Sequence, residues 1–321
     1  MMRPAVILVL PVLVAAVCGR CHAADAGPTA PWRPTPRVLT DPPAYYSPTL
    51  FAKKAEAKPG DWMAEHPEPP QSFQEYVAAK PIRPTRGRHT VVLAPVGPMD
   101  AGETARLGVL REFLEVYYTL PVRQGRPLGL EGVTSRERSM FGRNVRQYLT
   151  GEILYDVLRP AMADDTMCLV GVTMQDLYPE PSWNYVFGQA SLGHRVGVYS
   201  LLRFYPAFWG KPETPAAAQQ GLERSLHTLV HETGHMFGLY HCQTYDCVMN
   251  GTNSLAESDT RPIHLCPECL RKLRWCLGFD MAARYEALRT FYAAHGMNDE
   301  AAWVEKRLAQ CRGAKAGAAA P

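Results

Sequence analysis

The chain has 321 residues, of which 46% are hydrophobic and 20% are charged, and its formal net charge is +3. This length allows one large domain or two small ones with a sizeable core. The small net charge, and the lack of basic runs interleaved with aromatic residues, argue against a polyanionic partner. We therefore expect no nucleic-acid partner.

The first 26 residues have the layout of a secretory signal peptide. Arg3 precedes an apolar run from Ala5 to Val17, and small residues follow as far as Ala26. A membrane-spanning helix needs about 20 apolar residues, so an uncleaved anchor is the weaker alternative. We predict a signal peptide over residues 1–26 and an exported protein, secreted or periplasmic, with no stable membrane anchor after cleavage.

Residues 27–88 form a proline-rich leader that holds 13 of the 28 prolines. Such a density of proline disfavours regular helices and central strands. A disordered linker behind the signal peptide is the simplest interpretation of this composition.

The segment that follows predicts an α/β layering. Residues 90–94 predict a buried strand, and residues 101–119 predict an amphipathic helix. Residues 120–140, rich in glycine and arginine, predict a loop, and residues 145–158 predict a second helix. The nearly continuous apolar run over residues 167–172 predicts a central strand.

Two more strands are predicted over residues 184–190 and 195–201, joined by a short connection that contains glycine. Beyond residue 278, helical patterns over residues 279–294 and 298–311 predict a hairpin that turns at residues 295–297. We interpret residues 279–312 as a C-terminal helical hairpin. The alanine- and glycine-rich tail, residues 313–321, is predicted to be disordered.

A pattern typical of a catalytic zinc site lies between the strands and the hairpin, in a helix that is predicted to start after Pro215. His231 and His235 are four residues apart, so they share one helical face and can bind one metal ion. Glu232 lies where a general base is needed to deprotonate a zinc-bound water. Gly238 allows a left-handed exit from the helix, which lets His241 return as third ligand and leaves the fourth position open.

The helix around this motif has a regular apolar stripe, and an additional histidine precedes the motif by one turn. We interpret this residue, His227, as a partly exposed helix histidine and not as a ligand. The stripe predicts one face of the helix in the core; its residues are Leu222, Leu226, Leu229, Val230 and Phe237.

Seven cysteines remain after removal of the predicted signal peptide. In an oxidising compartment, disulfides are the default expectation for all of them. Two close pairs, the second a CxxC, instead fit a tetrahedral four-cysteine zinc site. The residues of these pairs are Cys242, Cys247, Cys266 and Cys269; the other three cysteines are Cys168, Cys276 and Cys311.

The extended histidine motif, with Cys242 directly after the third histidine and the later cysteines behind it, resembles the archaemetzincin family of zinc metallopeptidases in the metzincin clan. The chain is most similar to the longer, animal-type members. The resemblance favours the four cysteines as ligands of a second, structural zinc, and so implies two zinc ions per chain. It also implies that Met249 is the Met-turn residue beneath the catalytic zinc.

The same resemblance implies a metzincin-like catalytic domain over residues 89–278, an α/β domain with a mixed, mainly parallel twisted sheet and C-terminal helices. An antiparallel edge strand lines the cleft in metzincins. By this resemblance the substrate edge is Tyr185, Val186, Phe187 and Gly188, although a plain hairpin remains the alternative. From residue 47 onward the leader resembles the segment that precedes the catalytic domain in animal-type members, which suggests that it packs on that domain.

The expected function is therefore peptide-bond hydrolysis by zinc-activated water, with Glu232 as general base and a peptide or protein as substrate. Two alternatives remain: a zinc-stabilised binding protein, in which Glu232 has no role, and a zinc hydrolase of another amide or ester. For an additional oxyanion donor, Tyr185 and Tyr240 are candidates by position only. The sequence does not decide substrate preference, aminopeptidase or endopeptidase activity, an inhibitory role for the leader, or oligomeric state.

Overall fold

A computed structural model describes residue 39 and residues 41–318 of the chain. The predicted signal peptide, residues 1–26, lies outside the described residues, as do residues 319–321 of the predicted disordered tail. No helix in the described part of the chain is both long and apolar enough to span a bilayer.

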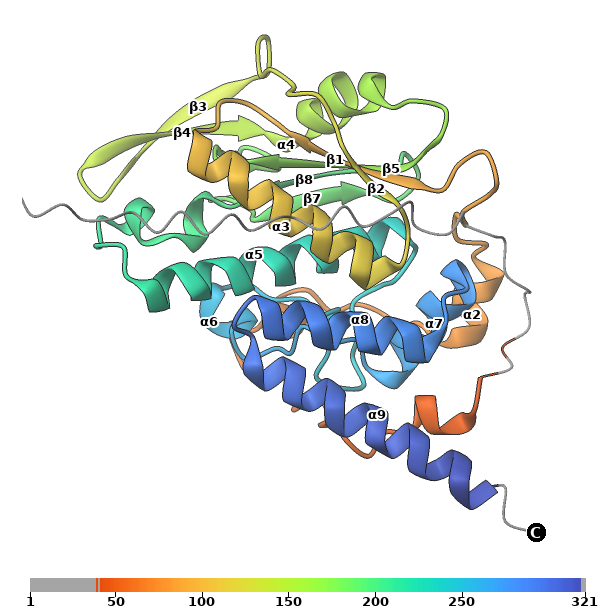
Figure 1. The fold of residues 1–321 in the computed structure, drawn as a ribbon. Helices are drawn as coiled ribbons and strands as arrows, with labels where there is room; N and C mark the ends of the chain where they lie inside the picture. The colour runs from red at the N-terminus through yellow and green to blue at the C-terminus, as the bar shows by residue number, and fades with distance from the viewer. Residues whose placement is uncertain (1–38, 40, 319–321) are drawn as a thin grey trace, which may run out of the picture. The chain divides into compact units, whose positions relative to one another are not determined.

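Five strands form the main sheet in the order β2–β1–β5–β8–β7 (Figure 1). Neighbouring strands are parallel except for β7, which pairs antiparallel with β8 and forms one edge. The predicted α/β class with a mixed, mainly parallel sheet is confirmed. The strands are β1 (Thr90–Pro95), β2 (Val122–Gln124), β5 (Thr166–Thr173), β7 (Gly188–Ser191) and β8 (Val196–Ser200).

The two faces of this sheet pack against different helices, because successive side chains of a strand point to opposite faces. Val91 and Leu93 of β1 lie in one core with α3 (Ala101–Tyr118) and α5 (Pro215–Met236). Val92 and Ala94 lie in a second core with the helical segment that follows residue 149. Figure 1 shows α3 and α5 together on one side of the sheet. The buried apolar stripe predicted for α5 therefore faces the first core.

The predicted helix over residues 145–158 is wrong in its first half. The segment Arg143–Leu149 is a strand, β4, which pairs antiparallel with β3 (Ser135–Met140) and parallel with β6 (Asp176–Tyr178). Its burial alternates with period two around Val145 and Gln147, which are buried, whereas Asn144 and Arg146 are exposed and Tyr148 is partly exposed. The chain becomes helical only from residue 150; these segments are α4 (Thr150–Glu152), the π-helical η2 (Ile153–Leu158) and the 3₁₀ turn η3 (Arg159–Ala161).

The predicted loop over residues 120–140 contains two strands, β2 and β3. Both are short or largely exposed, so neither carries a continuous apolar run that would reveal it in the sequence. Each is defined by its pairing partner, β1 for the first and β4 for the second. Two 3₁₀ turns, η4 (Leu202–Phe204) and η5 (Pro206–Trp209), then connect β8 to α5.

The described part of the leader has only short helical elements. Its Tyr45 and Tyr76 are nevertheless buried in the first core. Ser72 and Glu75 form a reciprocal capping box at the last of these helices. The leader thus packs on the rest of the chain, as the resemblance of this segment suggested. Its elements are η1 (Pro43–Tyr46), α1 (Trp62–Glu65) and α2 (Phe73–Ala78).

The C-terminal hairpin is present, and α8 lies beside α9 in Figure 1. The tail prediction is wrong at its start, because α9 continues to Ala318 where disorder was expected from residue 313. The last helices of the chain are α6 (Leu255–Ser258), α7 (Pro267–Leu277), α8 (Met281–Ala294) and α9 (Asn298–Ala318).

Candidate metal centre and cleft

Three histidine side chains converge at the end of α5, as their spacing predicted. Nitrogen atoms of His231, His235 and His241 all lie within 4.8 Å of one another. The Nε2 atoms of His231 and His235 are 3.1 Å apart. The helix delivers the first two residues, and Gly238, at a φ of +83°, turns the chain back to deliver the third.

The other ring nitrogen of each histidine is already engaged by an acceptor. His231 Nδ1 donates to the Val248 carbonyl at 2.7 Å, and His235 Nδ1 donates to the Leu239 carbonyl at 2.6 Å. His241 Nδ1 donates to the Glu68 carboxylate at 2.7 Å. Three imidazoles protonated at Nδ1 present three Nε2 lone pairs to one point, an arrangement that a cation between them would stabilise. The donor set therefore fits zinc with an open fourth position.

Glu232 lies beside this cluster and against the edge strand. Burial raises the pKa of Glu232 to about 7, while nearby His241 acts in the opposite direction. A Cβ atom on Gly188 of β7 would lie 3.4 Å from Glu232 Cγ, an ordinary contact distance, so this strand lies against the Glu232 side chain. Glu232 is thus next to both the histidine cluster and the edge of the sheet.

Met249, predicted to be the Met-turn residue, packs against the helix that carries the motif. It is fully buried, and a Cβ atom on Gly234 would lie 2.6 Å from its Sδ atom. Gly234 is therefore required for the helix to sit this close to the methionine. A backbone hydrogen bond of 2.7 Å from Cys242 to the Met249 carbonyl holds the same loop.

The four predicted cysteine ligands also come together. The Sγ atoms of Cys242, Cys247, Cys266 and Cys269 lie within 4.8 Å of one another, and the first and third are 3.6 Å apart. That separation exceeds the ~2.05 Å of a disulfide. It matches the roughly 3.8 Å between thiolates that bind one tetrahedral zinc at ~2.3 Å each. The cluster therefore fits a structural zinc.

The four thiols of the cluster interact closely with one another. Hydrogen bonds from the neighbouring thiols, that of Cys247 first, lower the pKa of Cys242, whereas burial raises the pKa of Cys247. Backbone N–H groups also point at the sulfur atoms: Cys266 donates to Cys247 Sγ at 3.2 Å. The other three cysteines of the described residues, Cys168, Cys276 and Cys311, are buried outside the cluster.

A cleft of about 960 Å³ runs past the histidines and Glu232. The predicted edge residues line it, but the strand bounds differ from the prediction. Only Gly188 belongs to β7; Val186 instead forms an isolated bridge with Leu177 of β6. Of the two tyrosines considered for an oxyanion role, Tyr185 lines the cleft, whereas Tyr240 is exposed outside its lining.

The prediction of a partly exposed His227 is wrong. This residue is only 8% exposed, and its Nε2 atom is buried without a hydrogen-bond partner. It does not belong to the three-histidine cluster. Its ring lies 6.5 Å from that of His231, centroid to centroid, and it lines the cleft.

Glu68 is a site residue that the sequence reasoning missed. Its carboxylate accepts hydrogen bonds from His241 Nδ1 and, at 2.7 Å, from Trp62 Nε1. The bond from His241 is the main reason why the pKa of Glu68 is lowered. Trp62 packs on Gly251 and meets the His241 ring edge-on at 5.3 Å. The leader thereby supplies the carboxylate that orients the third histidine, and only proximity in the fold could identify it.

Replacing Glu68 with alanine should weaken binding of zinc to the histidine cluster by roughly 10- to 100-fold, because His241 loses its orienting carboxylate. Competition with a chelator measures this change. Glu65→Ala, which removes an exposed carboxylate from the same leader, is the matched control. Equal zinc affinity in the Glu68→Ala and Glu65→Ala proteins would contradict the positioning role.

The chain is similar in sequence to several known proteins. The sequence model of peptidase family M54 matches residues 114–275. The chain is 36% identical over 269 residues to archaemetzincin-2 of Macaca fascicularis, covering 74% of each chain. It is 35% identical over 269 residues to human archaemetzincin-2, again covering 74% of each. Among solved structures, the chain is similar to an archaemetzincin from Methanopyrus kandleri, with 28% sequence identity and a TM-score of 0.45. The match covers 60% of this chain and 96% of that chain.

Proposed function

Because this chain belongs to the archaemetzincins, peptidase family M54, and is a zinc metallopeptidase, we propose that it hydrolyses peptide bonds with Glu232 as general base. In this proposal His231, His235 and His241 hold the catalytic zinc. The observation that carries it is the convergence of three histidine nitrogens beside the partly buried Glu232 carboxylate at the edge of a sheet. Each part of the arrangement has a distinct chemical task.

Zinc, when bound, acts as a Lewis acid that lowers the pKa of its bound water toward neutral pH and polarises a carbonyl group. Glu232 accepts the proton of the attacking water and later donates it to the leaving amine. A carboxyl group whose pKa burial raises to about 7 can perform both transfers near neutral pH. Met249 and the backbone acceptors of the histidines keep the ligand side chains in place.

The edge strand β7 supports an extended peptide as the substrate. An unpaired edge offers main-chain hydrogen bonds to a peptide that binds as an added strand, whatever its sequence. β7 pairs with β8 on one side only, and Gly188 brings its backbone next to Glu232. We propose that the scissile bond lies alongside residues 185–188, with a peptide or protein as substrate.

A library of peptides tests this function against the alternatives. The zinc-loaded protein should cleave at least part of the library, lose this activity with a chelator and regain it with zinc. Cleavage of small esters or non-peptide amides, without cleavage of any peptide, would favour the other hydrolase. Binding of peptides without turnover of any compound would favour the zinc-stabilised binding protein.

We also propose two zinc ions per chain, one in each cluster. The ion at the histidines has an open position, whereas thiolates enclose the other, so mild chelation should inactivate the protein before it unfolds. Metal analysis together with an unfolding curve measures both effects. One zinc per chain, with four cysteines that resist alkylation until they are reduced, would instead indicate disulfides among Cys242, Cys247, Cys266 and Cys269.

Export of the protein is a separate proposal, supported by the composition of residues 1–26. In this proposal the mature chain begins near residue 27 with the leader. N-terminal sequencing of the protein from its native source tests it, since an intact Met1 would contradict cleavage.

A further inference from the structure

A second cavity, of about 490 Å³, adjoins the catalytic cleft. It is bounded by the first half of α5, by the segment after α6 and by the turn between α8 and α9. His227 and Ser258 line both this cavity and the cleft, so the two spaces lie next to each other. One face of α5 leads from the cavity to the metal centre. It carries Glu223, His227 and His231, which follow one another at four-residue spacing.

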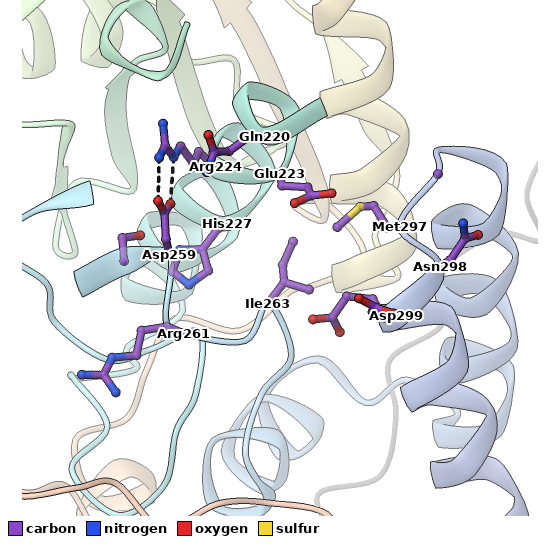
Figure 2. Close-up of a pocket in the computed structure, with 13 residues that line it drawn as sticks. Gln220, Glu223, Arg224, His227, Asp259, Arg261, Ile263, Met297, Asn298 and Asp299 are labelled. Carbon is purple, nitrogen blue, oxygen red and sulfur yellow. Dashed lines mark hydrogen bonds and ion pairs between the residues drawn. The ribbon is translucent and has the colours of Figure 1, made fainter. Parts of the chain in front are cut away.

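The lining of this cavity carries more negative than positive charge. Four carboxylates, those of Glu223, Asp259, Asp299 and Glu300, face two guanidinium groups. Both arginines are already paired: Arg224 with Asp259 at 2.5 and 2.8 Å, as Figure 2 shows, and Arg261 with Asp246 at 2.9 Å.

No arginine or lysine in the described part of the chain forms an ion pair with the remaining carboxylates. Glu300 accepts from His264 at 3.2 Å, and Glu223 accepts only from the Gln219 amide, at 2.9 Å. Asp299 is exposed, with no ion pair to the described residues. In Figure 2, Glu223 lies beside Met297, and Asp299 lies at the other side of the cavity.

Two buried polar atoms of the wall, His227 Nε2 and Arg261 Nε, have no hydrogen-bond partner among the described residues. His227 is only 8% exposed, and its Nε2 atom makes no hydrogen bond to the described residues. Burial lowers the pKa of His227 to about 4, so the ring adds no positive charge at neutral pH. A buried unpaired nitrogen has a free-energy cost that a donor or acceptor from a bound molecule would remove.

The chemistry of the walls favours an organic cation over a metal ion. The carboxylates of the cavity do not form a metal-like cluster in the described part of the chain, where only the three-histidine and four-cysteine groups do. Ile263 and Met297, each 5% exposed, provide apolar walls between the charged groups. An aliphatic stem with a charged end fits such a pocket, because the stem packs on apolar surface while the head reaches the carboxylates.

We propose that this cavity is a specificity pocket that takes the lysine or arginine side chain of a peptide substrate near the scissile bond. The proposal rests on the peptidase function proposed above. Glu223 lies eight residues before His231, about 12 Å along the helix axis, so only a long side chain would reach it from a peptide in the cleft. Glu223 and Asp299 are then the residues that determine specificity.

Paired peptides that differ only in lysine or norleucine, at each position around the cleavage site, test the pocket. We expect kcat/KM to favour lysine over norleucine by about tenfold or more at one position, since norleucine keeps the stem and lacks the ammonium group. Glu223→Gln and, independently, the exposed Asp299→Asn should each lower this ratio several-fold. Glu305→Gln removes an exposed carboxylate from α9 outside the cavity, and should leave the ratio unchanged.

Equal kcat/KM for lysine and norleucine at every position would overturn the proposal, as would a ratio that survives both Glu223→Gln and Asp299→Asn. If no peptide is cleaved, the proposed peptidase function is wrong. A measurement of peptide binding then tests the specificity pocket separately. Titration of the Glu232→Gln protein with the same peptides should then give a lysine peptide with a Kd about tenfold below that of its norleucine partner. Equal Kd values would overturn the pocket independently of catalysis.

Discussion

Replacing Glu232 with glutamine should lower kcat for peptide hydrolysis by ~10²- to 10⁴-fold, the range expected when a general base is removed. Glutamine keeps the shape of the side chain and cannot accept the proton. The carboxylate lies next to the ligand cluster but is not part of it, so zinc content and folding should stay the same.

Three measurements decide this prediction together: kcat on a cleaved peptide, zinc per chain and the midpoint of thermal unfolding. A variant with unchanged zinc and less than about a hundredth of the wild-type kcat supports the role of general base. Loss of zinc would make Glu232 a residue of the metal site. Retention of more activity than this, with zinc in place, would move the proton transfer to another group.

Replacing Cys269 with serine should weaken zinc binding at the histidine cluster by roughly 10- to 100-fold, although Cys269 does not contact a histidine ligand. The reason is the loop that connects the two clusters. Within it, Cys242 directly follows His241 and donates from its backbone to Met249, while the Val248 carbonyl orients His231. A change that releases the cysteine cluster therefore loosens supports of the histidine cluster as well.

Asn250 strengthens this connection. Fully buried, it donates from its side chain to the carbonyls of Cys242 and Tyr245 and accepts from the backbone of Cys247. The loop thus behaves as one unit that both clusters hold. Competition with a chelator, read out by activity and by metal analysis, measures the affinity for the catalytic zinc in the Cys269→Ser protein.

Cys276→Ser is the matched control for this experiment. Cys276 is another buried cysteine of α7, lies outside the cluster, and donates to the Ile82 carbonyl at 3.5 Å, which a serine can also do. The Cys276→Ser protein should bind the catalytic zinc with the same affinity as the wild-type protein. If Cys269→Ser also holds that zinc as tightly as wild type, the cysteine cluster stabilises the fold without organising the active site.

The elements that the sequence predicted well are those whose signal is continuous along the chain. The buried run at β5 and the periodic stripes of α3 and α5 show the face that each element buries. β4 was misread as a helix because its alternation covers only a few residues, including the polar but buried Gln147. Partner strands at both sides decide its conformation, and these lie far away in the sequence.

For the site, the sequence predicted the three histidines and the four cysteines that the fold brings together, and it proposed Glu232 as general base. Helical spacing places His231 and His235 on one face, and a glycine at position 238 permits the return of His241; both are local properties of the backbone. Only the tertiary structure decided which groups support that site. Glu68, Gly188 and the lining of the second cavity come from segments distant in sequence. Contacts of this kind depend on how the leader, the sheet edge and the last helix pack, and no short-range pattern encodes that packing.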